Sequence, residues 1–402
     1  MSLSHCTGFA TFCVGRNKVD GMTARIAIVG GGINGAGIAW ELARKDYEVV
    51  IFDKGAFGAQ TSSATTKMIH GGLRYLEGLH FGLVREALRA RKQLLDELPQ
   101  LVRPIEILLP IYADSPRSRF EIKIGLLLYD VLAGRHNLHH HRSLNAKELS
   151  ARAPLERRGL RGGFSYWDAQ VDDAELVRTV IASAVREGAS ARERTRVESL
   201  RRDGDGWIIR TADGEERFDL VINAAGPWMN ELLEANGIRA RYRLTLVRGS
   251  HLVLRDRVSD YGVLLQSVDD ERVFFVLPWK EGTLVGTTEV AQREPLDDVH
   301  ASNEEIDYLV TRFNRYFTAK ITTNDIASTF AGVRPLVGRA ANPSAIGREY
   351  RVIRRGNLIN VFGGKMTTFM SLAHRVSMRV DNYFGHVRSA REAVFAKLKI
   401  EN

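Results

Sequence analysis

The fold is decided by residues 25–53, which read RIAIVGGGINGAGIAWELARKDYEVVIFD. Residues 25–29 form an apolar, β-branched run that is typical of a buried strand, and a glycine-rich turn follows at once. Residues 36–45 have the composition of a helix, and residues 47–52 form a second apolar strand that ends at Asp53. This order of strand, turn, helix and strand is the βαβ unit that gives a dinucleotide-binding fingerprint its structural context.

Three glycines and one carboxylate in this stretch have the spacing of that fingerprint. Gly30, Gly32 and Gly35 let the chain turn tightly and approach a pyrophosphate without a Cβ clash. The start of the helix adds N–H donors and a partial positive charge. Asp53 is placed to bind the hydroxyls of an adenosine ribose, and an acid there disfavours a 2′-phosphate. The stretch therefore predicts FAD or NAD rather than NADP.

Length, composition and charge limit the class of protein. The 402 residues predict two or three domains, or one large fold with insertions. A share of 44% hydrophobic and 26% charged residues excludes disorder for most of the chain. The net charge of +9 favours an anionic partner, which is a phosphorylated small molecule, nucleic acid or an acidic membrane surface. Because no nucleic-acid recognition motif is present, we expect no nucleic-acid partner.

Cysteines, histidines and apolar runs exclude further classes. The only cysteines are Cys6 and Cys13, which excludes a disulfide framework for the folded body and fits a reducing, intracellular compartment. The histidines at 136–141 lack ligand spacing, so we expect no metal. No apolar run reaches about 18 residues, so we expect no transmembrane helix. We interpret residues 1–22 as a disordered extension or a consequence of start-site choice, with a weak organellar targeting segment as a further alternative.

Periodicity and turn residues predict the remaining elements. Apolar spacing predicts helices over 80–98, 173–187 and 303–318. Short strands separated by Asp-Gly turns predict a β-meander over 192–218, and alternating runs predict an antiparallel sheet over 243–289. Buried strands are expected at the apolar runs 220–222 and 358–362.

Four other segments combine glycines, hydroxyls or basic residues next to predicted strand ends. Residues 61–76 can line a pyrophosphate and a flavin ring, or form a polar surface loop. Residues 223–228 let the backbone pass close to a cofactor, or cap a helix. Residues 332–335 hold Arg334 between a glycine and a proline, and 363–368 present a glycine pair entering a helix, which can donate N–H groups to an anion.

In their order and spacing, these motifs resemble the FAD-dependent glycerol-3-phosphate dehydrogenases, above all the quinone-linked type. The resemblance covers about residues 25–380, and the segments that carry it are 30–39, 62–77, 171–174, 248–251, 286–288, 332–336 and 362–365. It implies an α/β fold, with a Rossmann-like FAD-binding domain and an antiparallel-sheet (α+β) cap domain of the D-amino-acid-oxidase type.

The resemblance also implies domain boundaries. A discontinuous FAD-binding domain would comprise 23–95, 155–240 and 325–402, and the substrate or cap domain would comprise 96–154 and 241–324. The substrate would bind between them. Longer members of the family continue into a C-terminal helical domain that we do not find here. Contacts made by that domain are therefore in doubt, and a homodimer stays open.

By motif, the resemblance implies FAD contacts in the glycine turns, in the 61–76 loop and at the strand ends. The implied residues are Gly30, Gly32, Asn34, Gly35, Asp53, Thr61, Ser62, Ser63, Lys67, His70, Gly71, Gly72, Leu73, Val197, Ala224, Gly226, Trp228, Gly332, Gly364, Lys365, Met366 and Thr367.

The implied substrate is sn-glycerol 3-phosphate, oxidised at C2 to dihydroxyacetone phosphate with hydride transfer to flavin N5. The family holds the substrate phosphate with arginines, which by motif are Arg334 and Arg348 here. Arg74 and Tyr75 would line the same pocket. Bidentate arginine geometry suits phosphate better than lysine does.

Three residues are expected to be catalytic. Arg334 would act on the bound substrate. His251 is the expected base, because an imidazole near its usual pKa can accept a proton at neutral pH. Lys365 would stabilise negative charge on the alkoxide or on the reduced flavin.

The resemblance implies that electrons pass to a membrane quinone. Residues 117–129 are basic at the start and then apolar, which is consistent with a helix in the membrane interface or with an ordinary buried element. We therefore expect a cytoplasmic protein peripherally associated with the cytoplasmic membrane. Three alternatives stay open: a glycerophosphate oxidase that uses O2, an FAD oxidoreductase for another hydroxy acid or amine, and a non-catalytic FAD-binding relative.

Overall fold

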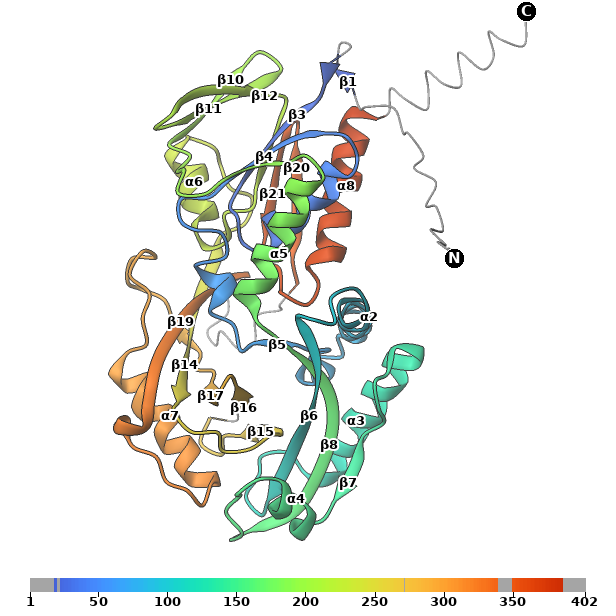
Figure 1. Cartoon of the computed structure of the whole chain (residues 1–402), viewed down its shortest axis with the longest axis vertical. Coiled ribbons are helices and arrows are strands. Elements are labelled where there is room, and N and C mark those ends of the chain that lie inside the picture. The colour runs from blue at the N-terminus through green and yellow to red at the C-terminus, as the bar shows by residue number, and fades with distance from the viewer. Residues whose placement is uncertain (1–17, 20–21, 271, 339–348, 386–402) are drawn as a thin grey trace, which may run out of the picture.

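The computed structural model describes residues 18–19, 22–270, 272–338 and 349–385. A mainly parallel sheet and an antiparallel sheet lie one above the other along the long axis of the molecule (Figure 1). Most of the predicted extension, residues 1–17 and 20–21, lies outside the described residues. Of the remainder, β1 (Lys18–Val19) pairs antiparallel with β2 (Met22–Thr23), so strand pairing begins inside the segment that we predicted to be disordered.

The upper sheet has six strands in the order β20-β21-β13-β3-β4-β9. They are β3 (Arg25–Val29), β4 (Glu48–Phe52), β9 (Ser190–Arg192), β13 (Leu220–Asn223), β20 (Arg351–Arg355) and β21 (Leu358–Phe362). All pairs are parallel except that of β20 at the edge. Strands covered on both faces carry continuous apolar runs, which is why four of these strands were predicted from the sequence.

Helices and a small sheet complete the upper part. α1 (Ile33–Ala43) packs against α5 (Asp173–Arg186) and α8 (Phe369–Phe384). The predicted β-meander is confirmed as β10 (Ser199–Asp203), β11 (Gly206–Thr211) and β12 (Gly214–Phe218), and its Trp207 and Phe218 belong to the same core. The short elements of this part are η1 (Thr61–Ser63), η4 (Gly226–Trp228) and α6 (Met229–Ala235).

The lower sheet has ten strands in all. They are β5 (Met68–Ile69), β6 (Val102–Tyr112), β7 (Arg142–Leu144), β8 (Leu160–Val171), β14 (Leu244–Leu254), β15 (Gly262–Gln266), β16 (Val273–Trp279), β17 (Gly282–Gly286), β18 (Val290–Ala291) and β19 (Ile326–Val337). The helices and 3-10 turns of this part are η2 (Leu73–Leu76), α2 (Phe81–Glu97), α3 (Arg119–Ala133), η3 (Gly134–His136), α4 (Ala146–Arg152), α7 (Asn303–Tyr316) and η5 (Thr323–Asp325). The helices predicted over 80–98, 173–187 and 303–318 are therefore α2, α5 and α7.

The structure divides the chain between the two sheets differently from the predicted domain boundaries. β8 pairs with β6 from Val102↔Val171 to Tyr112↔Leu160, and β19 pairs with β14. Both strands, together with β5, therefore belong to the lower sheet, whereas the predicted boundaries assigned their residues to the FAD-binding domain. The long antiparallel ladders β6–β8 and β14–β19 cross those predicted boundaries, and both lie within the lower sheet.

Residues 117–129 lie mainly in α3, which has two apolar faces. Ile122, Leu126 and Tyr129 are buried in the core of the lower part. The opposite face exposes a patch that we call the α3 apolar face, made of Phe120, Ile124, Leu127, Leu128 and Val131. In the described part of the chain, no helix combines the length and the hydropathy that crossing a bilayer requires.

Candidate functional site

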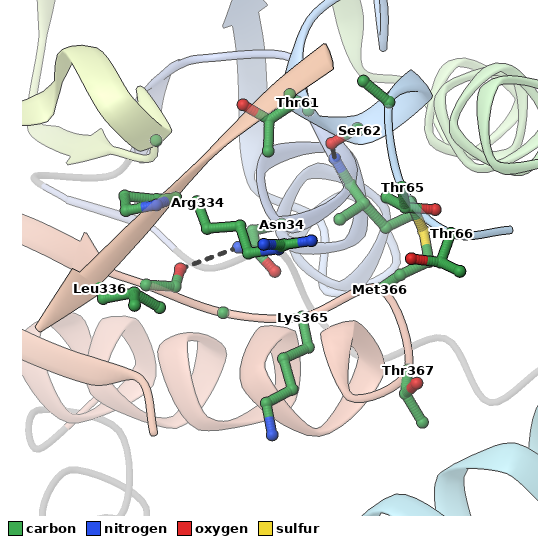
Figure 2. A pocket seen from close by; sticks show the side chains of 18 of the residues that line it. Asn34, Thr61, Ser62, Thr65, Thr66, Arg334, Leu336, Lys365, Met366 and Thr367 are labelled. Carbon is green, nitrogen blue, oxygen red and sulfur yellow. Dashed lines mark hydrogen bonds between the residues drawn. The ribbon is translucent and has the colours of Figure 1, made fainter. Parts of the chain in front are cut away.

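A cavity of about 1030 Å³ runs between the two sheets. Its walls come from the glycine turn after β3, the end of β4, the η1 and η2 segments, β19 and the turn that follows β21. Segments far apart in the sequence therefore meet around one space. Figure 2 shows side chains from several of them, including Asn34, Arg334 and Lys365.

The glycine turn at one end of the cavity leaves no room for side chains. A Cβ on Gly30, whose φ is +109°, would lie 2.4 Å from the Ala224 carbonyl oxygen, and one on Gly35 would lie 1.9 Å from the Gly30 carbonyl oxygen. Both approaches are far below van der Waals contact, so only glycine fits this turn. The turn therefore allows the backbone to approach a bound pyrophosphate closely, as the dinucleotide-binding fingerprint requires.

Asp53 is fixed at the end of β4 beside this turn. Its carboxylate accepts hydrogen bonds from the Gly31 N–H at 2.6 Å and from the Gly55 N–H at 2.8 Å. Burial nevertheless raises the pKa of Asp53 above its usual value. An oriented, partly buried carboxylate that lines the cavity is suited to accept hydrogen bonds from ribose hydroxyls.

The start of α1 has the features of an anion site. Gly32 is its N-cap, and the N–H of Ile33 donates to the Ser62 hydroxyl at 3.0 Å. Gly32 and Ser62 line the cavity, so a bound pyrophosphate would meet helix N–H groups and a hydroxyl together.

Asn34 extends the cradle toward the turn after β21. Its Nδ2 donates to the Gly363 carbonyl at 3.1 Å, drawn as a dashed line in Figure 2. Its buried Oδ1 has no hydrogen-bond partner among the described residues. Gly363 and Gly364 have φ of +74° and +114°, and a Cβ on Gly364 would lie 2.3 Å from Asn34. An orphaned acceptor in a glycine cradle fits a bound ligand that carries N–H groups.

Cationic and aromatic side chains also line the cavity. The guanidinium of Arg334 donates to Thr287 Oγ1 at 2.9 Å, and the Lys365 ammonium lies 4.0 Å from the ring centroid of Tyr75. Arg74 also lines this space. Positive side chains in the wall of a cavity can bind a substrate anion and stabilise developing negative charge.

His251 does not lie where it could contact a substrate directly. It is fully buried and is not part of the cavity wall. Its Nε2 lies 3.0 Å from Thr66 Oγ1, and its ring stacks on Phe330 with centroids 4.8 Å apart. Burial, with added repulsion from Arg334 and Lys67, holds the pKa of His251 well below its usual value. Thr66 itself lines the cavity and separates His251 from it.

Four predicted FAD contacts are also absent from the cavity wall. Lys67 is buried, and its ammonium pairs with Asp173 at 2.6 Å instead of facing a ligand. The Gly71 N–H donates to the Tyr129 hydroxyl at 2.8 Å, and the Ser63 hydroxyl donates to the Gln60 carbonyl. Gly35 packs against the Gly30 carbonyl inside the turn. The contacts of these four residues are therefore made within the protein, and the residues do not line the cavity.

The remaining predicted residues meet around the cavity, apart from Arg348, which lies outside the described residues. Those that line it are Gly30, Gly32, Asn34, Asp53, Thr61, Ser62, His70, Gly72, Leu73, Arg74, Tyr75, Val197, Ala224, Gly226, Trp228, Gly332, Arg334, Gly364, Lys365, Met366 and Thr367.

Other lining residues carried no predicted role. Thr287 contacts Arg334, and its segment 286–288 contributed to the resemblance without suggesting this contact. Asp168 lines the cavity and pairs with the buried Arg91 at 2.8 Å. No local pattern marks Asp168, because its partner lies far away in the sequence.

The fold and this site define a flavin-dinucleotide oxidoreductase. The family model described as "FAD dependent oxidoreductase" matches residues 25–375, so the chain belongs to that family, and its cofactor is FAD. The structure has the family's fold, with a Rossmann-like FAD-binding domain and an antiparallel cap sheet.

Two known proteins and one solved structure are similar to this chain over most of its length. The chain is 38% identical to D-erythritol 1-phosphate dehydrogenase of Brucella abortus over 375 residues, covering 90% of this chain and 74% of the relative. It is 36% identical to aerobic glycerol-3-phosphate dehydrogenase of Escherichia coli over 377 residues, with the same two coverages. Glycerol-3-phosphate dehydrogenase from Bacillus halodurans complexed with FAD superposes with a TM-score of 0.70 at 25% identity, covering 89% of this chain and 64% of that chain.

Proposed function

We propose that the protein oxidises a secondary alcohol of a phosphorylated polyol, with sn-glycerol 3-phosphate as the first candidate and dihydroxyacetone phosphate as its product. The observation that carries this proposal is the guanidinium of Arg334 in the cavity that also contains Lys365 and Arg74. Two relatives of similar identity are named for phosphorylated polyols of three and four carbons. That supports the class of substrate more strongly than the choice within it.

When bound, FAD supplies an acceptor for the hydride of the oxidised carbon. Gly32, Asn34 and Asp53 would hold it from the α1 side, and Gly364 to Thr367 would hold it from the opposite side. Arg334 and Arg74 would bind the substrate phosphate, and Lys365 would stabilise negative charge near the reacting centre.

The hydroxyl proton needs an acceptor that reaches the cavity. His251 stays neutral because of its burial and its cationic neighbours, and within the described residues its side chain makes a polar contact with Thr66 Oγ1 at 3.0 Å. We infer that His251 acts through the Thr66 hydroxyl, since Thr66 lines the cavity and His251 does not. The same neighbours disfavour an imidazolium, so a proton would reside on His251 only transiently.

Anaerobic absorbance of the holoenzyme in the flavin band tests the reaction directly. Each phosphorylated polyol is added separately, and glycerol and inorganic phosphate serve as controls. Bleaching by sn-glycerol 3-phosphate and not by glycerol is the expected result. Bleaching by D-erythritol 1-phosphate alone would change the substrate and keep the class. No bleaching by either compound would refute the proposed function.

We further propose that a membrane quinone accepts the electrons and that the protein associates peripherally with the cytoplasmic membrane. The α3 apolar face supports this, because two of its residues, Ile124 and Leu128, also line the cavity. An apolar acceptor held at a membrane surface could therefore approach the cavity from this side. The net charge of +9 favours anionic lipid.

Sedimentation with anionic lipid vesicles tests the membrane contact. Changing Phe120, Leu127 and Val131 together to serine should abolish sedimentation, since these side chains are exposed and lie outside the core. Val185→Ser with Met378→Ser is the control, because both residues are exposed apolar residues on other helices. Equal sedimentation of the two variants would contradict the assignment. Peroxide formation in air would favour O2 as the acceptor.

A further inference from the structure

Arg334 is held by a chain of contacts that begins on its own face of the lower sheet and continues on the opposite face. In the β14–β19 ladder it lies opposite Val247, and its guanidinium extends over Gly249. A Cβ on Gly249 would lie 2.5 Å from Arg334 Nη2 and 2.5 Å from Thr287 Oγ1. Gly249 therefore provides the space in which the arginine and the threonine meet.

The turn after β17 holds the guanidinium on this face. Thr287 Oγ1 accepts a hydrogen bond from Arg334 Nη2 at 2.9 Å, and the Thr288 carbonyl accepts one from Nη1 at 3.4 Å. Both contacts come from adjacent residues of one turn, so the position of the guanidinium depends on the position of that turn.

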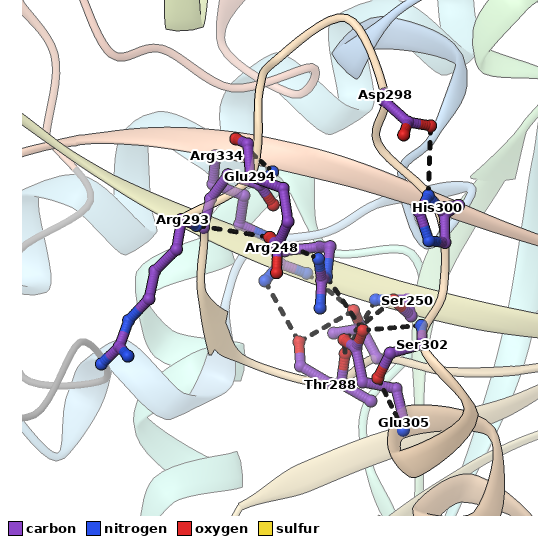
Figure 3. A network of polar contacts seen from close by, with 12 residues as sticks. Arg248, Ser250, Thr288, Arg293, Glu294, Asp298, His300, Ser302, Glu305 and Arg334 are labelled. Carbon is purple, nitrogen blue, oxygen red and sulfur yellow. Dashed lines mark hydrogen bonds and ion pairs between the residues drawn. The ribbon is translucent and has the colours of Figure 1, made fainter.

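The Thr288 side chain points to the opposite face, toward the start of α7. Its hydroxyl donates to Glu305 Oε1 at 2.5 Å and accepts the Ser250 N–H at 2.8 Å. Glu305 is 4% exposed, and Thr288 is 2% exposed. Figure 3 shows Glu305, Ser250 and Thr288 gathered on one side, with Arg334 beyond them. The turn therefore links a buried carboxylate to the cavity arginine.

Glu305 is itself held by several donors. Arg248 Nε donates to its Oε2 at 2.9 Å, the Ser250 hydroxyl donates to its Oε1 at 2.8 Å, and Ser302 closes a capping box with it. Because residues alternate in a strand, Arg248 and Ser250 face α7 while Gly249 between them faces Arg334. A carboxylate with this many donors is a rigid anchor, since moving it would break several hydrogen bonds at once.

We propose that Glu305 is a positioning residue for substrate binding. Through the Thr288 hydroxyl it fixes the 287–288 turn and so aims the Arg334 guanidinium into the cavity. The inference rests on the proposed function only in taking Arg334 as the group that binds the substrate phosphate. The link itself is a chain of hydrogen bonds from Glu305 to Thr288 and on to Arg334.

Paired variants separate positioning from general stability. Glu305→Gln removes the charge of the anchor, and Glu304→Gln makes the same change at an exposed neighbour in the same helical turn. Thr288→Val removes the link while leaving the Arg248–Glu305 pair intact, so it serves if Glu305→Gln does not fold. Thr288→Ser restores the hydroxyl.

Two measurements on the FAD-loaded protein decide the outcome. For Glu305→Gln and Thr288→Val, we expect the dissociation constant for inorganic phosphate, followed by flavin absorbance, and KM to rise roughly tenfold, with kcat within about threefold. Glu304→Gln and Thr288→Ser should match the wild type. A fold that is merely weakened would lower the active fraction, and hence the apparent kcat, without raising KM.

A crystal structure of the Thr288→Val holoenzyme gives the second measurement. The expected result is a guanidinium of Arg334 displaced from Thr287 Oγ1. An unmoved guanidinium together with wild-type phosphate affinity would overturn the inference. If the wild type is reduced by neither phosphorylated polyol, the proposed function fails, and the position of Arg334 in the variant still decides this inference.

Discussion

Arg91→Met should destabilise the protein strongly, because it leaves a buried carboxylate without its cation. Arg91 and Asp168 are 0% and 2% exposed, and Arg91 Nη1 lies 2.8 Å from Asp168 Oδ1. Arg91 also donates to the carbonyls of Trp167 and His136. Methionine approximates the length of the side chain and supplies none of these donors.

The magnitude follows from the environment of the pair. Removing one partner of a buried ion pair costs about 3–5 kcal/mol, mostly because the remaining charge is uncompensated. Among the described residues, Asp168 would keep two neutral donors, the Tyr129 hydroxyl and the Gly71 N–H. With an unfolding entropy of about 2.1 cal/mol/K per residue over 402 residues, this cost corresponds to a fall in Tm of about 4–6 °C.

Thermal unfolding of the FAD-loaded protein at pH 7.5 is the assay. Arg178→Met is the control, because Arg178 and Glu175 form an ion pair of similar length, 2.7 Å, with side chains 57% and 47% exposed. Exposed pairs contribute about 0–1 kcal/mol, so the Tm of this control should fall by no more than about 1 °C. Adding Asp168→Asn to Arg91→Met should recover part of the loss by neutralising the stranded charge.

Similar Tm values for Arg91→Met and Arg178→Met would refute the reasoning. The buried pair would then contribute no more than a solvent-exposed one. A double variant no more stable than Arg91→Met would refute the electrostatic part alone, and the loss would then lie in the hydrogen bonds to Trp167 and His136.

Three further predictions concern the site. Gly30→Ala should weaken FAD binding by about tenfold or more, because the residue has φ of +109° and its Cβ would meet the Ala224 carbonyl. The amount of FAD that stays bound after ultrafiltration measures the affinity, and full retention would contradict the prediction. Gly249→Ala should raise the dissociation constant for inorganic phosphate roughly tenfold with little change in FAD content, because the added Cβ would displace Arg334. The constant is measured by titrating the flavin absorbance with phosphate, and an unchanged value would argue against the placement of Arg334. The pKa of His251 is well below its unfolded value in the folded protein, so the unfolded chain binds more protons at mildly acidic pH. The contribution of His251 to the free energy of unfolding is therefore fully present above about pH 6.5 and falls as the pH drops, by at most about 1.4 kcal/mol per pH unit. His251→Gln should flatten the Tm profile between pH 7.5 and 5.5, and an unaltered slope would exclude His251 as its source.

Local patterns predicted the elements whose evidence lies within one stretch of chain. The run 25–53 contains the strand, the turn, the helix and the acid of its own βαβ unit, so β3, α1 and β4 follow from it. The Asp-Gly turns likewise predicted the β10–β12 meander. In such elements the hydrophobic period and the turn residues carry the information by themselves.

Pairing between distant segments was beyond local patterns. β8 and β19 are apolar strands that either sheet could have accepted, and only their ladders with β6 and β14 assign them to the lower one. The partners of site residues pose the same problem. Lys67 meets Asp173 across the fold, and His251 is shielded by Thr66. A motif names residues near a site without telling which side chains reach it.

The walls of the cavity have a consequence for the order in which the protein becomes functional. Gly30 stands near one end of the chain and Thr367 near the other, and both face the same space. During synthesis, the residues around Gly30 emerge long before those that close the opposite wall. FAD can therefore be enclosed only after almost the whole described chain has been made and both sheets have formed. Cofactor loading thus follows the synthesis of residues 30–367, and flavin content reports that both sheets have formed.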